Sequence, residues 1–492
     1  MTLTILVFLP LVAGLFQAFL PRELGKWFAV SAAIGVFIYS IALLLDFPSG
    51  GGGLRWVVDE TWIKELGIHY SLGLDGLNLF LILLTTLLWT VATIAAALRD
   101  WDSARLFYFH LALAETAVLG AFVAQDVALF VFFFDLMLVP FYFLIGTWGG
   151  PDRVRATTKF VIYTLVGSLL MLAAAVALGV LSTPDGGQIS FNISDLTQRT
   201  LSGGSQDWIF LLFALAFLVK MPAFPLHGWM PDAYRATPLP VLVLLSGVLS
   251  KVGAYGFLRI VLPTMPHAAQ HFQELMIVIA VVSILYGSVL AFSQDEARLV
   301  AGYSSIAQLG FITLGIFSLD PKGAQGAVFQ MVNHGIVVGA LFIIIGALAL
   351  RAGGTELLSR MGGIATRAPV LAALFLIVAL ATLAMPGSGN FVGELYILFG
   401  AFDTKLAYGL VATIGVALAS VYMIRMYQRS MHNKVGPGVE SFEGRRSELA
   451  LLAPLVALII FLGVYPNFVL QRTEKSTTAA IPHSETSRIA DR

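Results

Sequence analysis

Residues 207–230 have the sequence DWIFLLFALAFLVKMPAFPLHGWM, an apolar run long enough to cross a membrane, which takes about 20 helical residues. Lys220 lies within this run, and Pro222 follows it two residues later. Because proline has no backbone N–H, it kinks or breaks a helix when it lies in the interior. We therefore expect a membrane helix that breaks beside a charged residue. A second break is predicted at Met385-Pro386-Gly387, inside the apolar run 368–402.

Apolar runs of this kind make up most of the chain. Of its 492 residues, 58% are apolar and 12% are charged, whereas about a quarter of positions are charged in a soluble domain. We predict an all-α polytopic membrane protein with about 14 transmembrane helices. The predicted helices are residues 1–20, 27–46, 74–98, 106–124, 127–147, 157–181, 207–230, 238–262, 274–293, 297–318, 323–350, 368–402, 405–428 and 448–470.

The composition also excludes several functions. Basic and acidic residues number 29 each, so no basic excess points to nucleic acid. The chain has no cysteine, which excludes a thiolate-held iron–sulfur cluster, a disulfide and a Cys-type zinc site. It also lacks a GxxxxGK[ST] loop, so nothing in it supports nucleotide hydrolysis.

The two predicted breaks lie in corresponding places of two groups of helices. The fourth to eighth helices form one group, and the ninth to thirteenth form the other. Because five is an odd number, the two groups must run in opposite senses, and broken helices in inverted repeats point to a transporter's ion site. We divide the chain into a three-helix part, a first and a second five-helix repeat, a last helix and a polar tail that we expect to be disordered. These parts are residues 1–104, 105–262, 263–430, 431–470 and 471–492.

The loops predict the orientation. Placing both termini on the extracytoplasmic side puts most basic loop residues on the cytoplasmic side, as the positive-inside rule requires.

Five titratable residues are predicted at membrane depth, each on a different helix: Asp135, Lys220, Lys251, His334 and Glu394. A basic group near the middle of a helix costs on the order of 2.5–3.5 kcal/mol on insertion scales, so it usually faces the bundle interior or a hydrated path. An imidazole can exchange protons at physiological pH. This series lacks metal-ligand spacing such as HExxH and suits a proton relay. The alternative interpretation is structural, an ion pair for Lys251 or a satisfied core residue for His334.

Two further candidates, His110 and Glu115, lie on the predicted fourth helix. They could extend the series, but we rank them lower because either could lie near a helix end or satisfy a neighbour.

Eight stretches are similar to the antiporter-like membrane subunits of the respiratory NADH:quinone oxidoreductase, complex I. They are LGLDGLNL from Leu72, VPFYFLIGTWGG from Val139, KFVIYTLVGS from Lys159, KMPAFPLHGWMPDA from Lys220, GVLSKVGAYGFLR from Gly247, RLVAGYSS from Arg298, FQMVNHGIVVGALF from Phe329 and MPGSGNFVGE from Met385. The resemblance implies a fourteen-helix fold with two inverted five-helix repeats, broken seventh and twelfth helices, and a central hydrophilic axis.

The same resemblance implies roles for the five residues. The fifth-helix carboxylate, Asp135, would pair with Lys220, and Lys251 would pass protons toward Glu394. His334 matches a histidine of the eleventh helix. Glutamate at position 394 favours the M-type chain, because the resemblance implies a lysine at this position in the L- and N-type chains.

The sequence departs from the family at two of these places. The fifth-helix carboxylate is usually glutamate, and Asp135 is one methylene shorter, so a contact with Lys220 would need a water molecule. Gln308 stands where the family often has a histidine, and an amide cannot carry a proton as imidazole does.

The function implied is that of a proton-translocating subunit in a bacterial cell membrane, driven by quinone reduction elsewhere in complex I. We expect no cofactor on this chain, with NADH, flavin, iron–sulfur clusters and quinone on partner subunits. The partners implied are the L- and N-type chains, small membrane subunits, the redox arm and the lipid bilayer, with no nucleic acid. The alternatives are a subunit of a multisubunit cation/proton antiporter or a membrane-bound hydrogenase, or a structural scaffold, which poorly explains the cost of the buried charges.

Overall fold

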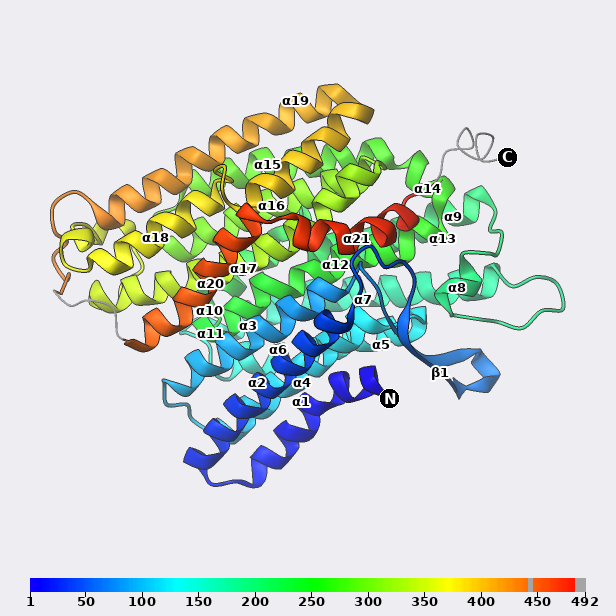
Figure 1. Ribbon diagram of the computed structural model, residues 1–492, viewed down its shortest axis with the longest axis horizontal. Coiled ribbons are helices and arrows are strands. Elements are labelled where there is room, and N and C mark those ends of the chain that lie inside the picture. Colours follow the sequence, from blue (N-terminus) through cyan, green and yellow to red (C-terminus); the bar gives the residue numbers. More distant parts are fainter. Residues whose placement is uncertain (441–445, 483–492) are drawn as a thin grey trace.

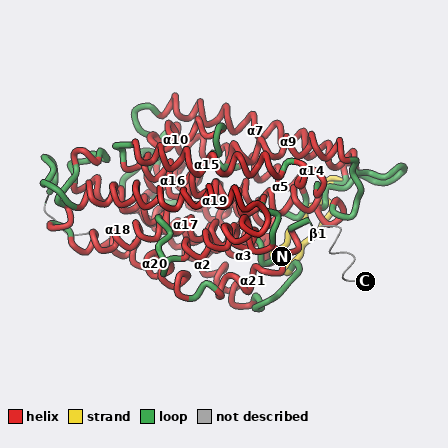
Figure 2. The backbone as a smooth tube through the Cα atoms, turned by 90° about the horizontal axis from the view of Figure 1, so that it is seen from above, coloured by secondary structure: helices red, strands yellow, loops and turns green. Residues whose placement is uncertain are grey.

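Helices that run roughly side by side form nearly all of the molecule (Figures 1 and 2). The structure is a computed structural model that describes residues 1–440 and 446–482. The amino-terminal part contains α1 (Thr2–Phe19), α2 (Arg22–Asp46), β1 (Arg55–Ile63), β2 (Ile68–Leu74) and α3 (Leu79–Ala97). The next part contains α4 (Ala104–Val123), α5 (Val127–Leu136), α6 (Leu138–Gly146), α7 (Arg153–Leu181), α8 (Ile193–Leu196), α9 (Gly203–Lys220), α10 (Met230–Ala236), α11 (Leu239–Leu244), α12 (Ser250–Gly256) and α13 (Leu262–Thr264). The last part contains α14 (Pro266–His271), α15 (Gln273–Ser293), α16 (Ala297–Phe317), α17 (Pro321–Arg351), α18 (Pro369–Thr382), α19 (Gly389–Met431), α20 (Arg446–Val464) and α21 (Asn467–Ala480).

The predicted number of membrane crossings agrees with these elements. Within the described residues, 13 helices are long and apolar enough to span a membrane, and α18 is a shorter apolar helix. One of the 13 is α19, which contains a kink at Lys405, where φ is −143° and ψ is 62°. Splitting α19 there, and joining its first part to α18 as one broken helix, gives the fourteen predicted segments. The all-α polytopic fold is therefore confirmed, whereas the division into domains stays a prediction.

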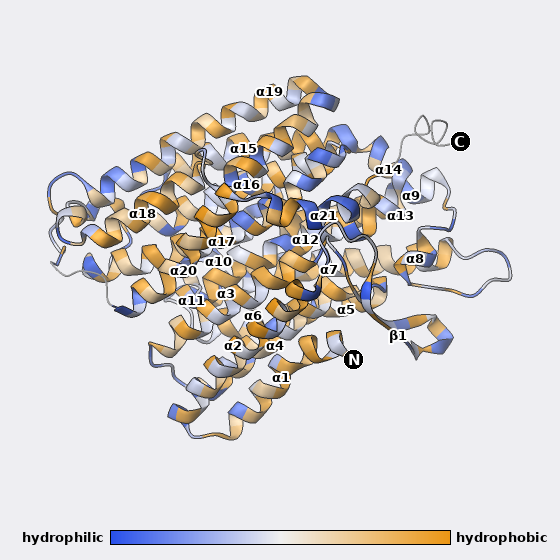
Figure 3. Cartoon of the chain, viewed as in Figure 1, coloured by the Kyte–Doolittle hydropathy of each residue, from blue (hydrophilic) through white to orange (hydrophobic). Residues whose placement is uncertain are grey.

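The core of the bundle lies around α16, α17 and the run from α11 to α13. Every residue from 323 to 342 of α17 is buried, and no residue between Leu239 and Thr264 is exposed. Outer helices instead expose apolar side chains such as Phe16, Ile38 and Leu169, and Figure 3 shows hydrophobic colour along them. Such surfaces suit contact with lipid, since lipid tails are themselves apolar.

Both predicted helix breaks are confirmed. The first separates α9, which ends at Lys220, from α10, which begins at Met230. The break leaves the carbonyl of Val219 without a helical partner, and Trp229 Nε1 donates a hydrogen bond to it at 2.9 Å. The freed backbone group is thus satisfied by a side chain from the far side of the break.

The second break lies between α18 and α19. Ala384 and Gly387 both have positive φ, of +55° and +99°, a conformation that favours glycine and cannot continue a helix. The side-chain oxygen of Ser388 then accepts a hydrogen bond from the N–H of Phe391 and caps α19. The chain therefore stops and restarts its helix within the predicted segment 368–402.

Two features differ from the prediction. An antiparallel hairpin of β1 and β2 lies between α2 and α3, where the sequence analysis assigned no element. The expectation of a disordered tail from residue 471 is wrong for its first part, because α21 continues to Ala480. The hydroxyl of Ser476 accepts a hydrogen bond from Gly76 N–H, and Leu470 O accepts one from Gln325 Nε2. Buried small and apolar side chains recurring every three or four residues give α21 a packed face; residues 483–492 lie outside the described residues.

Candidate functional site

Lys251 lies on α12 in the centre of the protein and is 0% exposed. Its Nζ contacts Ser246 O at 2.7 Å, Ser250 Oγ at 3.2 Å and His334 Nδ1 at 2.9 Å. An ammonium group has three donors, and these three acceptors match them. None of the three acceptors is a carboxylate. The structural ion pair considered for Lys251 is therefore not formed within the described part of the chain.

The backbone beside Lys251 departs from α geometry. Two π-helical turns, Leu245–Leu249 and Phe257–Val261, lie on either side of α12. Such turns are rare and are frequently found at functional sites. The first of them contains Ser246, whose carbonyl accepts the lysine hydrogen bond.

His334 is 3% exposed on α17 and faces Lys251 across the gap between α17 and α12. If Lys251 is charged and donates, the Nδ1 of His334 accepts and its remaining proton is on Nε2. The two residues, 83 positions apart in the chain, therefore share a direct path for a proton.

A second hydrogen-bonded chain connects α17 to Glu394, which is 3% exposed on α19. Gln330 Nε2 donates to Gln308 Oε1 at 2.6 Å, and Gln308 Nε2 donates to Glu394 Oε1 at 2.7 Å. Gln330 lies four residues before His334, so about 6 Å of helix separates them on one face. Gln330 Oε1 and Glu394 Oε2 are buried without a hydrogen-bond partner. The amides therefore bridge most of the distance between the histidine and the glutamate.

Gln330 was missed by the sequence analysis, and Gln308 was treated only as the loss of a histidine. A signal for Gln330 was present, because it is a polar residue in a largely apolar stretch, one turn before His334 and so on the same face of the helix. Ser246 and Ser250 were also missed, since serines that accept hydrogen bonds inside helices have no distinctive pattern in sequence.

Lys220 is 5% exposed at the end of α9. Its Nζ lies 4.6 Å from the centre of the Phe134 ring, a cation–π contact. The helix break thus leaves its ammonium against an aromatic ring, and no hydrogen bond from this ammonium to a backbone carbonyl is formed within the described residues.

Asp135 does not contact Lys220 directly in the described structure. Its Oδ1 is buried without a hydrogen-bond partner, although the two charges interact at longer range. The side chain lines a groove of about 670 Å³, whose lining also includes Trp62 of the hairpin and Leu172 of α7. The missing contact is consistent with the shorter side chain of aspartate, which predicted the need for a bridging water.

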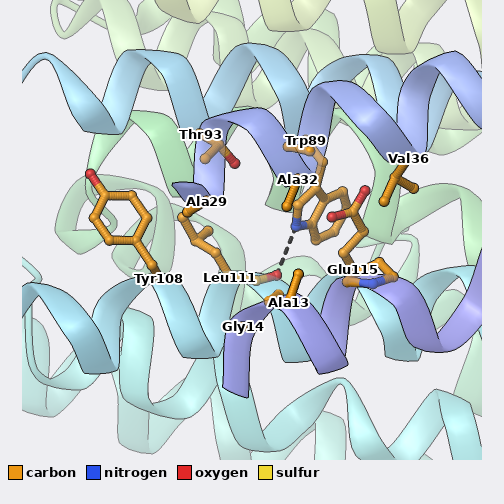
Figure 4. Close-up of a pocket in the computed structure, with 13 residues that line it drawn as sticks. Ala13, Gly14, Ala29, Ala32, Val36, Trp89, Thr93, Tyr108, Leu111 and Glu115 are labelled. Carbon is orange, nitrogen blue, oxygen red and sulfur yellow. Dashed lines mark hydrogen bonds between the residues drawn. The ribbon is translucent and has the colours of Figure 1, made fainter. Parts of the chain in front are cut away.

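The two lower-ranked candidates lie apart from this axis. His110 Nδ1 is 2.7 Å from Leu106 O, one turn back on α4, and its ring packs 4.7 Å from that of Phe143. Glu115 faces a cavity among α1 to α4 (Figure 4). Within the described residues, neither has a hydrogen bond to any of the five axis residues.

Another buried polar cluster was not selected from the sequence. Arg259 Nη2 contacts Asp75 Oδ1 at 2.6 Å, and its Nε donates to Tyr255 Oη at 2.9 Å. This cluster joins the loop before α3 to the end of the eighth predicted helix. The described residues contain no group of three or more His, Asp or Glu side chains placed to hold a metal ion.

Comparisons with known proteins support the resemblance found in the sequence. The model of the NADH:quinone oxidoreductase/Mrp antiporter transmembrane family matches residues 124–419, which include all five axis residues. NADH-quinone oxidoreductase subunit M of Rhodobacter capsulatus is 37% identical over 483 residues, covering 95% of this chain and 94% of that protein.

Solved structures show the same fold. A chain of respiratory complex I from Thermus thermophilus, determined with bound NADH, matches with a TM-score of 0.89 and 31% identity, covering 98% of this chain and 100% of that one. A chain of the Mrp complex from a Dietzia species matches with a TM-score of 0.83 and 21% identity, covering 96% of this chain and 52% of that one, and shows the fold alone. Because the family model matches more than half of the chain and a relative above 30% identity covers almost all of it, this protein belongs to the NADH:quinone oxidoreductase/Mrp antiporter family of membrane proteins.

Proposed function

We propose that this chain is an antiporter-like, proton-translocating membrane subunit of a bacterial NADH:quinone oxidoreductase. The observation that carries the proposal is the buried Lys251–His334 hydrogen bond, which holds a titratable pair at the protein centre without a carboxylate partner. The likeness to subunit M over nearly the whole chain supports the assignment to that enzyme complex. NADH oxidation and quinone reduction would then take place on partner subunits that carry the flavin, iron–sulfur clusters and quinone site.

In this proposal protons move along the axis of five residues. Lys220 accepts a proton, and Asp135 tunes its affinity through the longer-range interaction between their charges. Lys251 and His334 pass a proton through their direct contact, and Glu394 receives it beyond the two amides. Glutamine amides do not titrate, so water beside the unpartnered oxygen atoms of Gln330 and Glu394 would complete the path.

In this proposal, the energy of quinone reduction reaches the axis through electrostatic interactions between neighbouring charges. Two unit charges about 10 Å apart interact by about 1.7 kcal/mol at an effective dielectric constant of about 20, which is more than a tenfold change in proton affinity. A change in charge at one end therefore shifts the proton occupancy of the next residue. Buried residues with few counter-ions, such as Lys251, respond most to such a change.

The same proposal implies the membrane location of the chain, its orientation and its partner subunits. The chain would lie in the bacterial plasma membrane with both termini on the extracytoplasmic side, beside L- and N-type chains, small membrane subunits and the redox arm. The exposed apolar side chains of the outer helices support contact with lipid and with other membrane subunits.

The proposal is tested with the assembled complex in sealed vesicles, by measuring NADH oxidation and proton uptake together. Lys220→Ala and Glu394→Gln should each abolish or strongly reduce proton transport coupled to NADH oxidation, because each removes a proton-binding group from the axis. The matched control is Lys322→Ala, since Lys322 is an exposed lysine whose side chain is 62% accessible and pairs with Asp403. Full proton transport in both axis variants, at normal assembly, would contradict the proposed role.

A further inference from the structure

A small cavity lies among the amino-terminal helices α1, α2, α3 and α4, and none of the five axis residues lines it (Figure 4). It offers about 20 Å³ to the centre of a water molecule. Its lining is mostly small and apolar, with Ala13, Gly14 and Ala29 from the first two helices. Gly14 permits the close approach of α1 to α4, because a Cβ there would be 2.5 Å from that of Ala112. Glu115 is the one acidic residue of the lining.

Glu115 is buried in this cavity without a visible compensating charge. The residue is 3% exposed, and its Oε1 has no hydrogen-bond partner. In the described residues no lysine, arginine or histidine forms an ion pair with it. Trp89 also lines the cavity, but its indole N–H already donates to Leu111 O at 2.8 Å (Figure 4). The lining therefore supplies no positive charge that would balance an ionised carboxylate, and its two hydroxyl groups, on Thr93 and Tyr108, form no hydrogen bond with Glu115 in the described residues.

The cost of burial decides whether the Glu115 carboxyl is ionised or protonated. An isolated carboxylate in an apolar interior costs many kcal/mol and takes up a proton instead. A protonated carboxyl still has one donor and a free acceptor, and each would cost about 1–3 kcal/mol if it stayed unpaired. A partner small enough for the cavity is therefore needed.

The size of the cavity identifies that partner. A cavity needs roughly 10–15 Å³ of such space to hold one water molecule, so this one has room for a single water. A bound metal cation would need about six oxygen ligands. Apart from Glu115, the lining has hydroxyl groups only on Thr93 and Tyr108, and Tyr108 lies at the other side of the view in Figure 4. The site therefore fits water and lacks the ligands for a cation.

We propose that this cavity is a water site in which Glu115 keeps its proton and binds one water molecule, separate from the proton axis. The site goes beyond the proposed transport function, because none of its residues belongs to the axis.

Infrared spectroscopy of the purified complex tests the protonation state. The spectrum of the wild type minus that of Glu115→Gln should show one carbonyl stretch of a protonated carboxyl, which shifts to lower frequency in D₂O. The matched control is Glu23→Gln, because Glu23 is exposed and pairs with Lys26 at 2.6 Å. The control should lose only bands of an ionised carboxylate. Loss of ionised carboxylate bands from Glu115→Gln as well would overturn the proposal.

A high-resolution density map of the intact complex tests the ligand. We expect one isolated peak within hydrogen-bond distance of Glu115 in the wild type, and no peak in Glu115→Leu, whose side chain fills the space. If Glu115→Leu does not assemble, Glu115→Gln serves in its place and should retain the peak. An empty wild-type cavity, or continuous density from a lipid chain, would contradict water binding. Neither measurement depends on proton transport, so both remain decisive even if the proposed function fails.

Discussion

Lys251 brings a titratable amine to the protein centre, and its direct partners are neutral groups. Its partners are a carbonyl, a hydroxyl and an imidazole, each a dipole that stabilises an ammonium less than a carboxylate would. The charge of Lys251 is therefore less firmly fixed than that of a lysine in a buried ion pair. A residue with this surrounding is suited to lose and regain a proton as the charges of its neighbours change.

The depth of Lys251 could be predicted from the sequence, but its partners could not. An apolar run on both sides of a lysine gives its place along a helix. His334 is 83 positions away, and only the packing of α17 against α12 brings the two together. The contact of Asp135 also depends on packing between distant segments. A pair with Lys220 was predicted from the resemblance, whereas the structure shows the Asp135 side chain lining a groove without direct contact to Lys220.

Gln308 provides a test at this scale, because it contacts both Gln330 and Glu394. Gln308→Leu should leave two buried polar groups unpaired, at about 1–3 kcal/mol each, and should reduce proton transport severalfold. Gln308→His should preserve transport, since imidazole can donate to Glu394 and can itself carry a proton. The measurement is proton uptake per NADH oxidised, with thermal unfolding of the complex measured in parallel.

The pair of variants separates transport from stability. If Gln308→Leu is less stable but transports protons normally, the amide is structural and the path from His334 to Glu394 does not pass beside it. If Gln308→His transports protons as poorly as Gln308→Leu, an imidazole at this position cannot replace the amide. The shape of the amide is then more important for transport than its ability to form hydrogen bonds.

At the scale of elements, proline and glycine predicted where the helices break. The physical cause is local, since Pro222 lacks an N–H and Gly387 has a positive φ. What closes the first break lies further along the chain, whereas Ser388 caps the helix after the second break locally. The carbonyl of Val219 finds its donor in Trp229, ten residues later, after the chain has turned. The β1–β2 hairpin was missed because its strand RWVVDETWI is largely exposed and lacks a clear alternation of buried and exposed residues.

Trp229→Phe tests whether this donor holds the break in place. The variant keeps an aromatic ring but leaves a buried carbonyl unpaired, so we expect a loss of stability of about 1–3 kcal/mol. Thermal unfolding of the purified protein measures this change as a lower Tm. The matched control is Trp62→Phe, because Trp62 is 51% exposed and packs edge to face with Phe132. Equal unfolding temperatures for Trp229→Phe and the wild type would mean that water or a rearranged backbone satisfies Val219.

At the scale of the whole molecule, contacts between segments that are distant in sequence hold together two opposite ends of the helix bundle. The hairpin, the start of α17 and helix α21 meet at one end, where Gln325 Nε2 donates to Leu470 O. The start of α20 meets the end of α17 at the other, through the pair of Arg351 and Glu448 at 2.8 Å. The number of helices followed from the sequence because each apolar run is local. The position of α21 did not, since its few apolar residues become meaningful only beside the surface they cover.

The absence of cysteine from the chain makes the orientation directly measurable. A single cysteine introduced as Lys64→Cys lies in the exposed hairpin, and one introduced as Arg360→Cys lies in an exposed loop at the opposite end. If both termini are extracytoplasmic, a membrane-impermeant maleimide added to intact cells should label Lys64→Cys and leave Arg360→Cys unlabelled. The positive-inside rule predicts this outcome because most basic loop residues share the side of Arg360. Permeabilised cells should show labelling of both variants, which controls for access. The reverse pattern in intact cells would invert the orientation and with it the direction in which the axis carries protons.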